Sequence, residues 1–175
     1  MRLLSRIIEA AALTLATLFV SAAGASAQDK PLPKFGDYPV KTIYKGKHAK
    51  PKIYGDLKRY YESSYTSAIE GGVTFAGEYA IAKRPCGITC VMPDIVSVKT
   101  GKVVIIQFSI SGWREYHDNF DPVEVKSDSR LIVFLGARNE KLRLGLHYYV
   151  LENGKLKFLR TVENDGNFME PLPKD

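Results

Sequence analysis

The chain has few cysteines: only Cys86 and Cys90 occur in 175 residues. No second cysteine pair or histidine pair stands at the spacing of zinc ligands, so we expect no structural metal. The C-x3-C spacing also differs from the C-x-x-C motif of thiol oxidoreductases. A glycine-rich phosphate loop, a G-x-S-x-G elbow and an H-E-x-x-H motif are missing as well. The sequence therefore supports none of the enzyme classes that these motifs identify, and we expect no cofactor.

The sequence also lacks a long apolar run. Its most apolar segment, residues 10–20, is much shorter than the roughly 20 residues that a membrane-spanning helix needs. This segment follows Arg2 and Arg6 and precedes an A-x-A pattern that ends at Ala27. That order is typical of a secretory signal peptide. We therefore expect a signal peptide over residues 1–27, a periplasmic or secreted protein and no membrane span after cleavage, with an uncleaved anchor as the alternative.

Charge of either sign forms no long block. The formal net charge is +6, and the densest group of lysines, in residues 45–52, is interrupted by Gly and Pro. A basic surface favours an anionic polymer of the cell envelope as a partner, such as lipopolysaccharide or a phosphate polymer. An envelope protein is the other partner considered, and a mildly basic soluble protein is the simpler alternative. Export and the lack of a binding motif disfavour nucleic acid.

Export gives the two cysteines a structural interpretation. In an oxidising compartment they are most simply paired, so we expect a Cys86–Cys90 disulfide. The loop that it closes is short, and chain entropy therefore gives the bridge only about 2 kcal/mol of stabilisation. Because a paired sulfur is not a nucleophile, a Cys-His-Asp catalytic set is disfavoured.

One amphipathic helix is predicted over residues 56–70, near the N-terminus of the mature chain. Apolar and aromatic side chains recur there at helical spacing. The stripe comprises Leu57, Tyr60, Tyr61, Tyr65, Ala68 and Ile69. Asp56 suits the N-cap and Gly71-Gly72 suits the C-terminal stop. We expect the tyrosines to face the core, with a carbohydrate-binding platform as the alternative.

Strand patterns follow the helix. They cover residues 74–82, 95–99, 102–110, 130–136, 146–151 and 156–162. Thr100-Gly101 and Asn153-Gly154 predict tight turns between neighbouring strands. The nearly continuous apolar run at 103–108 predicts a central strand, whereas His147 is expected on the exposed side of its strand. Since no crossover helix separates the strands, they should pair antiparallel. The predicted fold is α+β, mainly an antiparallel sheet of about five to seven strands.

Four segments make up the predicted domain organisation. They are the signal peptide at 1–27, an extended arm at 28–52, a single α+β domain at 53–165 and a polar tail at 166–175. The arm is rich in Pro, Lys and Gly. Its aromatic residues predict that parts of it pack on the domain, and a flexible linker is the alternative.

Three short motifs resemble those of an uncharacterised family of small exported bacterial proteins. The motifs are F-A-G-E-Y at 75–79, C-G-I-T-C at 86–90 and T-G-K-V at 100–103. The family reads F-A-G-H-Y, W-G-C-G-x-x-C and V-D-x-x-T-G-x-V, so this chain departs from it at Glu78, Arg84-Pro85 and Ser97. The resemblance covers most of the mature chain. It implies export and a bridged cysteine loop, and it brings no activity.

A binding surface is expected on two loops that mix aromatic, apolar and charged residues, as contact loops do. Its candidate residues are Arg84, Ile88, Thr89, Trp113, Arg114, Tyr116, His117 and Phe120. We expect a non-catalytic binding or interaction module of the cell envelope. Packing of Trp113 and Phe120 over an open sheet edge is the alternative for the second loop.

The competing hypothesis is a small periplasmic hydrolase or metal-dependent enzyme that uses loop residues around His117. Asp118 and Asp121 could add oxygen ligands there, although both also suit turns. Carboxylates for a glycosidase-type pair exist, but no motif selects among them. These carboxylates are Glu78, Asp94, Glu115 and Asp118. We therefore expect no catalytic residue and no metal ligand.

Overall fold

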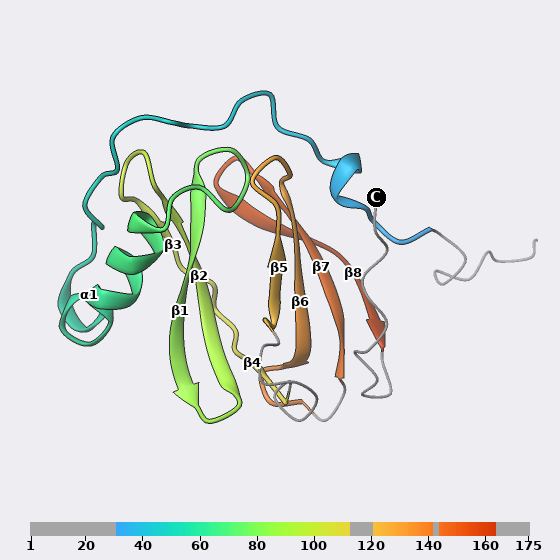
Figure 1. The fold of residues 1–175 in the computed structure, drawn as a ribbon. Helices are drawn as coiled ribbons and strands as arrows, with labels where there is room; N and C mark the ends of the chain where they lie inside the picture. The colour runs from blue at the N-terminus through green and yellow to red at the C-terminus, as the bar shows by residue number, and fades with distance from the viewer. Residues whose placement is uncertain (1–30, 113–120, 142–143, 164–175) are drawn as a thin grey trace, which may run out of the picture. The chain divides into compact units, whose positions relative to one another are not determined.

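The protein is seen in a computed structural model that describes residues 31–112, 121–141 and 144–163 (Figure 1). The predicted signal peptide at 1–27, residues 113–120 of the predicted contact loop and the predicted polar tail at 166–175 lie outside the described residues. Met1–Pro31 and Leu32–Asp175 group into separate units, and the fold below is that of the second. Within the described ranges, no helix is both long and apolar enough to cross a membrane.

The described residues form an antiparallel sheet of eight strands, one α-helix and one 3-10 turn. The elements are η1 (Phe35–Asp37), α1 (Gly55–Glu70), β1 (Tyr79–Gly87), β2 (Cys90–Ser97), β3 (Val103–Val104), β4 (Ile110–Ser111), β5 (Val123–Val125), β6 (Leu131–Arg138), β7 (Leu144–Glu152) and β8 (Lys155–Glu163). The strand order is β1-β2-β4-β6-β7-β8, with β3 also on β2 and β5 also on β6. The predicted α+β class and antiparallel pairing are confirmed.

The predicted count of five to seven strands was too low. One expected strand, at 102–110, is divided into β3 and β4, and β5 lies between the expected strands at 102–110 and 130–136, where no strand was expected. The stretch from Val104 to Ile110 has two more residues than the stretch of β2, Val91 to Ile95, that it faces. It therefore bulges, and the N–H of Ile106 bonds to the Asp94 carboxylate at 2.9 Å instead of to a strand.

The first strand also begins later than its sequence pattern indicates. Phe75 and Tyr79 exchange two backbone hydrogen bonds of 2.8 Å around a tight turn, so the strand begins at Tyr79 rather than Thr74. Ala76 and Gly77 hold positive φ angles of 46° and 78° in this turn. The strand then continues to Gly87, through residues expected to form a loop.

The helix forms where its periodicity predicts it, at Gly55–Glu70. Tyr54, rather than Asp56, occupies the N-cap position, whereas Gly71-Gly72 does end the helix. Tyr65 is completely buried, but Tyr60 is 60% exposed, so not every tyrosine of the stripe faces the core. Whether the helix lies near the N-terminus of a mature chain depends on the predicted cleavage.

Buried apolar side chains form a cluster on each side of the sheet at the helix end. Between α1 and the strands lie Ile53, Tyr65, Ile69, Ala80, Ala82, Val96 and Val98. The opposite side of β1 and β2 packs with β6 and β7 around Phe75, Ile95, Ile132, Phe134 and Tyr149. Figure 1 shows α1 beside β1 and β2, which is the side that carries the first cluster.

The segment from residue 32 to 53, called the arm below, runs along the domain with η1 as its only regular element. Its backbone N–H groups reach carbonyls of the domain at four places. Val40 bonds to Asp128, Tyr44 to Gly77, Ala49 to Val98 and Lys52 to Gly101, at 2.7 to 2.9 Å. The prediction that parts of the arm pack on the domain is confirmed for this stretch.

His147 is buried at 5% exposure, so its predicted placement on the exposed side of the strand is wrong. Its Nε2 lies 3.0 Å from the Gly136 carbonyl and its Nδ1 lies 2.9 Å from the Thr161 hydroxyl. The neutral ring satisfies both contacts when Nε2–H donates to the carbonyl and the hydroxyl donates to Nδ1. Burial lowers the pKa of His147, and the charge of Arg138 lowers it further, against the raising effect of the Gly136 hydrogen bond.

A loss of stability on mild acidification follows from this lowered pKa. Unfolded histidine titrates near pH 6.5, at about its ordinary pKa. Below that pH the unfolded chain binds the proton before the folded chain does, so the free energy of unfolding should fall as the pH drops. Denaturant unfolding of His147→Gln between pH 7.5 and 5.5 should show a flatter profile than the unmodified protein. Equal slopes in the variant and the unmodified protein would contradict the assignment to His147.

Candidate functional site

Exposed lysines gather where the arm meets the β2–β3 turn. Lys52 N–H bonds to Gly101 and Ala49 N–H bonds to Val98, so arm and turn lie side by side. The lysine surface comprises Lys41, Lys45, Lys47, Lys50, Lys52, Lys99 and Lys102, all exposed. None of them forms an ion pair with another described residue. Their charges are therefore available to a partner of opposite sign.

A pocket of about 470 Å³ lies within the lysine surface. The arm from Val40 to Lys45 lines one side, and Ala76, Gly77, Glu78 and Lys99 line the other. Gly77 allows this approach, because a Cβ there would lie 2.5 Å from the Thr42 carbonyl oxygen. Lys99 Nζ also lies 5.9 Å from the centre of the Tyr44 ring. The arm thus holds an aromatic ring and several ammonium groups around one opening.

Glu78 is the acidic residue in this pocket, and a hydrogen bond holds it in place. The hydroxyl of the buried Ser97 donates to Glu78 at 3.0 Å and also accepts the Thr100 N–H at 3.0 Å. Glu78 and Ser97 are two of the positions at which the chain departs from the family pattern, and they touch. The family resemblance itself stays a prediction.

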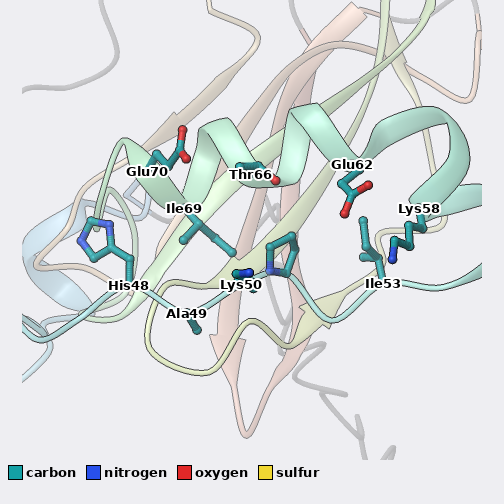
Figure 2. Close-up of a pocket in the computed structure, with 10 residues that line it drawn as sticks. His48, Ala49, Lys50, Ile53, Lys58, Glu62, Thr66, Ile69 and Glu70 are labelled. Carbon is teal, nitrogen blue, oxygen red and sulfur yellow. The ribbon is translucent and has the colours of Figure 1, made fainter.

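A second opening, of about 620 Å³, separates the arm from α1 (Figure 2). The residues that line it, called the helix groove below, are His48, Ala49, Lys50, Pro51 and Ile53 from the arm and Lys58, Glu62, Thr66, Ile69 and Glu70 from the helix. Ile53 and Ile69 are buried at 5% and 2% exposure and give the groove an apolar floor. Its charged side chains are exposed.

A buried polar cluster connects α1, β1 and β2 behind these surfaces. The Asp94 carboxylate is fully buried and accepts the Tyr65 hydroxyl at 2.5 Å and Arg84 Nε at 2.7 Å. Arg84 Nη2 adds a contact of 3.3 Å, and the Ile106 N–H completes the set. Burial, together with the hydrogen bond to Asp94, raises the pKa of Tyr65, so its hydroxyl stays a donor. These hydrogen bonds link α1 to the sheet, so the role of the cluster, called the buried joint below, is structural.

The predicted binding residues divide into three groups. Arg84 is 8% exposed and paired with Asp94, so it does not belong to an exposed contact surface. Ile88 and Thr89 lie at the tip of the β1–β2 hairpin, where Ile88 is 84% exposed and Thr89 is half-buried. The other candidates, Trp113, Arg114, Tyr116, His117 and Phe120, lie outside the described residues, and their roles stay predictions.

The hairpin tip is closed by the predicted disulfide between Cys86 and Cys90, which the structure confirms. The bridge lies at a register shift, since Pro85 pairs with Val91 whereas Gly87 pairs with Cys90. Within the described residues, no group of three or more His, Cys, Asp or Glu side chains is placed to hold a metal ion. Searches of protein-family models, curated proteins and solved structures found no match to this chain.

The sequence pattern indicated only the part of the lysine surface that is contiguous in the chain. The lysines of residues 45–52 stand out as a dense basic group, but Lys99 and Lys102 lie some fifty positions later in the chain. Only the pairing of the arm with the β2–β3 turn brings them together. The helix groove left no signal in the sequence, because its two walls come from different elements.

Proposed function

We propose that this chain is an exported, non-catalytic binding module of the cell envelope, and that its lysine surface binds an anionic polymer rich in phosphate. The observation that carries the proposal is the convergence of exposed lysines around the Tyr44 and Lys99 pocket, none of which forms an ion pair with a residue in the described ranges. Ammonium groups at several points along a surface attract a polymer that bears repeated negative charges.

The character of the surface favours binding over catalysis. A general acid or base usually owes its reactivity to burial or to a closely placed charge, and both are typical of enclosed active sites. The lysines here are solvent-exposed and spread along an extended segment. Such an arrangement suits many weak contacts, each worth well under about 1 kcal/mol, which add up along a polymer.

Polyphosphate of defined chain length is a suitable probe for this surface. We expect the purified protein to bind it with an affinity that decreases as salt concentration rises, because exposed charge pairs are screened. A triple variant, Lys41→Gln, Lys45→Gln and Lys99→Gln, should weaken binding about tenfold. Calorimetric titration at two salt concentrations measures both effects.

A second triple variant separates this surface from net charge. Lys141→Gln, Lys155→Gln and Lys157→Gln remove the same number of charges from exposed positions beyond the arm and the β2–β3 turn. This control should bind polyphosphate within about twofold of the unmodified protein. Equal losses in the two variants, or no binding at all, would refute the proposed surface.

A further inference from the structure

The helix groove offers a second binding site, with a charge pattern unlike that of the lysine surface. The helix wall presents the acidic Glu62 and Glu70, and the arm wall presents Lys50. Figure 2 shows Lys50 between the two glutamates along the groove. Within the described residues, neither glutamate forms an ion pair, even though Lys58 is one helical turn from Glu62.

We propose that the helix groove binds an extended peptide in which two cationic side chains flank an acidic one at alternating positions. The spacing of the charges carries this proposal. Glu62 and Glu70 are eight residues apart on α1, which corresponds to about 12 Å along the helix axis. In an extended peptide, side chains at positions i, i+2 and i+4 share one face, and the outer two are about 13 Å apart. Cations at i and i+4 thus match the glutamates, and an acid at i+2 matches Lys50.

The apolar floor and the polar wall define the remaining contacts. Ile53 and Ile69 offer apolar surface to the stems of long cationic side chains, which bury their methylene groups while the charged ends reach polar partners. Thr66 lies on the same helical row, between the two glutamates. The site shares Lys50 with the lysine surface, but its two glutamates would repel a polyanion, so the two proposed ligands differ in charge.

Three synthetic peptides with blocked, uncharged termini test the proposal against simple charge attraction. The matched peptide contains Lys-Ser-Glu-Ser-Lys, the swapped peptide contains Glu-Ser-Lys-Ser-Glu, and the scrambled peptide contains Lys-Lys-Ser-Ser-Glu. The protein carries a net charge of +6, so unspecific attraction favours the swapped, more acidic peptide. The proposal expects the opposite, with the matched peptide binding at least about fivefold more tightly than the other two in titration calorimetry.

Variants of the full chain assign the binding to this groove. Glu62→Gln with Glu70→Gln should remove the preference for the matched peptide, whereas Asp128→Asn with Glu140→Gln, at exposed positions elsewhere, should keep it. A third variant, Glu62→Lys, Glu70→Lys and Lys50→Glu, should prefer the swapped peptide. Circular dichroism checks that each variant is folded.

Two results would overturn the proposal. One is tighter or equal binding of the swapped peptide by the unmodified protein, and the other is the absence of measurable binding of the matched peptide. Polyphosphate binding should survive in the Glu62→Gln and Glu70→Gln variant. Loss of peptide binding with retained polymer binding, or the reverse, therefore distinguishes failure of this proposal from failure of the proposed function.

Discussion

Asp94→Ala should destabilise the protein by about 3 to 5 kcal/mol, because it leaves the buried guanidinium of Arg84 without its counter-charge. The substitution also removes the acceptor for the Tyr65 hydroxyl and the Ile106 N–H. A loss of that size is a large fraction of the stability of an ordinary domain, which is about 5 to 15 kcal/mol. Denaturant unfolding measured at neutral pH gives the free energy directly.

The adjacent residue in β1 supplies a control. Lys83 pairs with Asp121 at 2.5 Å, but the two side chains are 41% and 51% exposed. Lys83→Ala should therefore cost less than about 1 kcal/mol. Replacing both buried partners, by Arg84→Met with Asp94→Leu, should be less harmful than Asp94→Ala alone, since no unpaired charge remains. If Asp94→Ala costs no more than Lys83→Ala, the buried joint does not hold the helix to the sheet.

Gly101→Ala should detach the arm from the β2–β3 turn. A Cβ at this position would lie 1.9 Å from the Lys50 carbonyl oxygen, a backbone atom that cannot rotate away. Gly101 also has a φ of +72°, which costs other residues about 1 to 3 kcal/mol. We expect destabilisation beyond that range, together with weaker polyphosphate binding, because the arm carries most of the lysine surface.

Gly154→Ala separates the two contributions to this effect. Gly154 has a nearly identical φ of +71°, but a Cβ there has no neighbour within 4 Å. Gly154→Ala should therefore lower the free energy of unfolding only by the cost of the positive φ, and it should leave polyphosphate binding unchanged. Equal destabilisation by the two alanine substitutions, with equal polymer binding, would show that contact between the arm and Gly101 matters little. Thermal unfolding and calorimetric titration of both variants provide the comparison.

The motifs with local causes were predictable. Helical periodicity and the two glycines after it located α1 to within a residue. Asn153-Gly154 forms the expected β7–β8 turn, with positive φ at both positions. The Cys86–Cys90 bridge followed from the expected compartment and from the presence of only two cysteines. Each of these depends on residues close together in the chain, so the sequence contains the necessary information.

The errors arose where a distant residue competes with a local pattern. The apolar run at 103–108 is typical of a central strand, yet Asp94 takes the Ile106 N–H and the segment bulges. Arg84 lies in a segment that resembles an exposed loop, but Asp94 and the α1 tyrosines bury it. One buried carboxylate thus explains both errors, and its burial depends on how the helix packs on the sheet.

Local sequence patterns were sufficient to predict the α+β class, the antiparallel pairing, the helix, the β7–β8 turn and the cysteine pair. Periodicity and turn chemistry act over a few residues, so they can be read without knowing the fold. Which residues form the two candidate surfaces depends instead on how distant segments pack together. The lysine surface and the helix groove exist because the arm packs against Gly77 and Gly101, where the lack of a side chain allows close backbone contact. That contact joins segments far apart in the chain, and no local pattern specifies it.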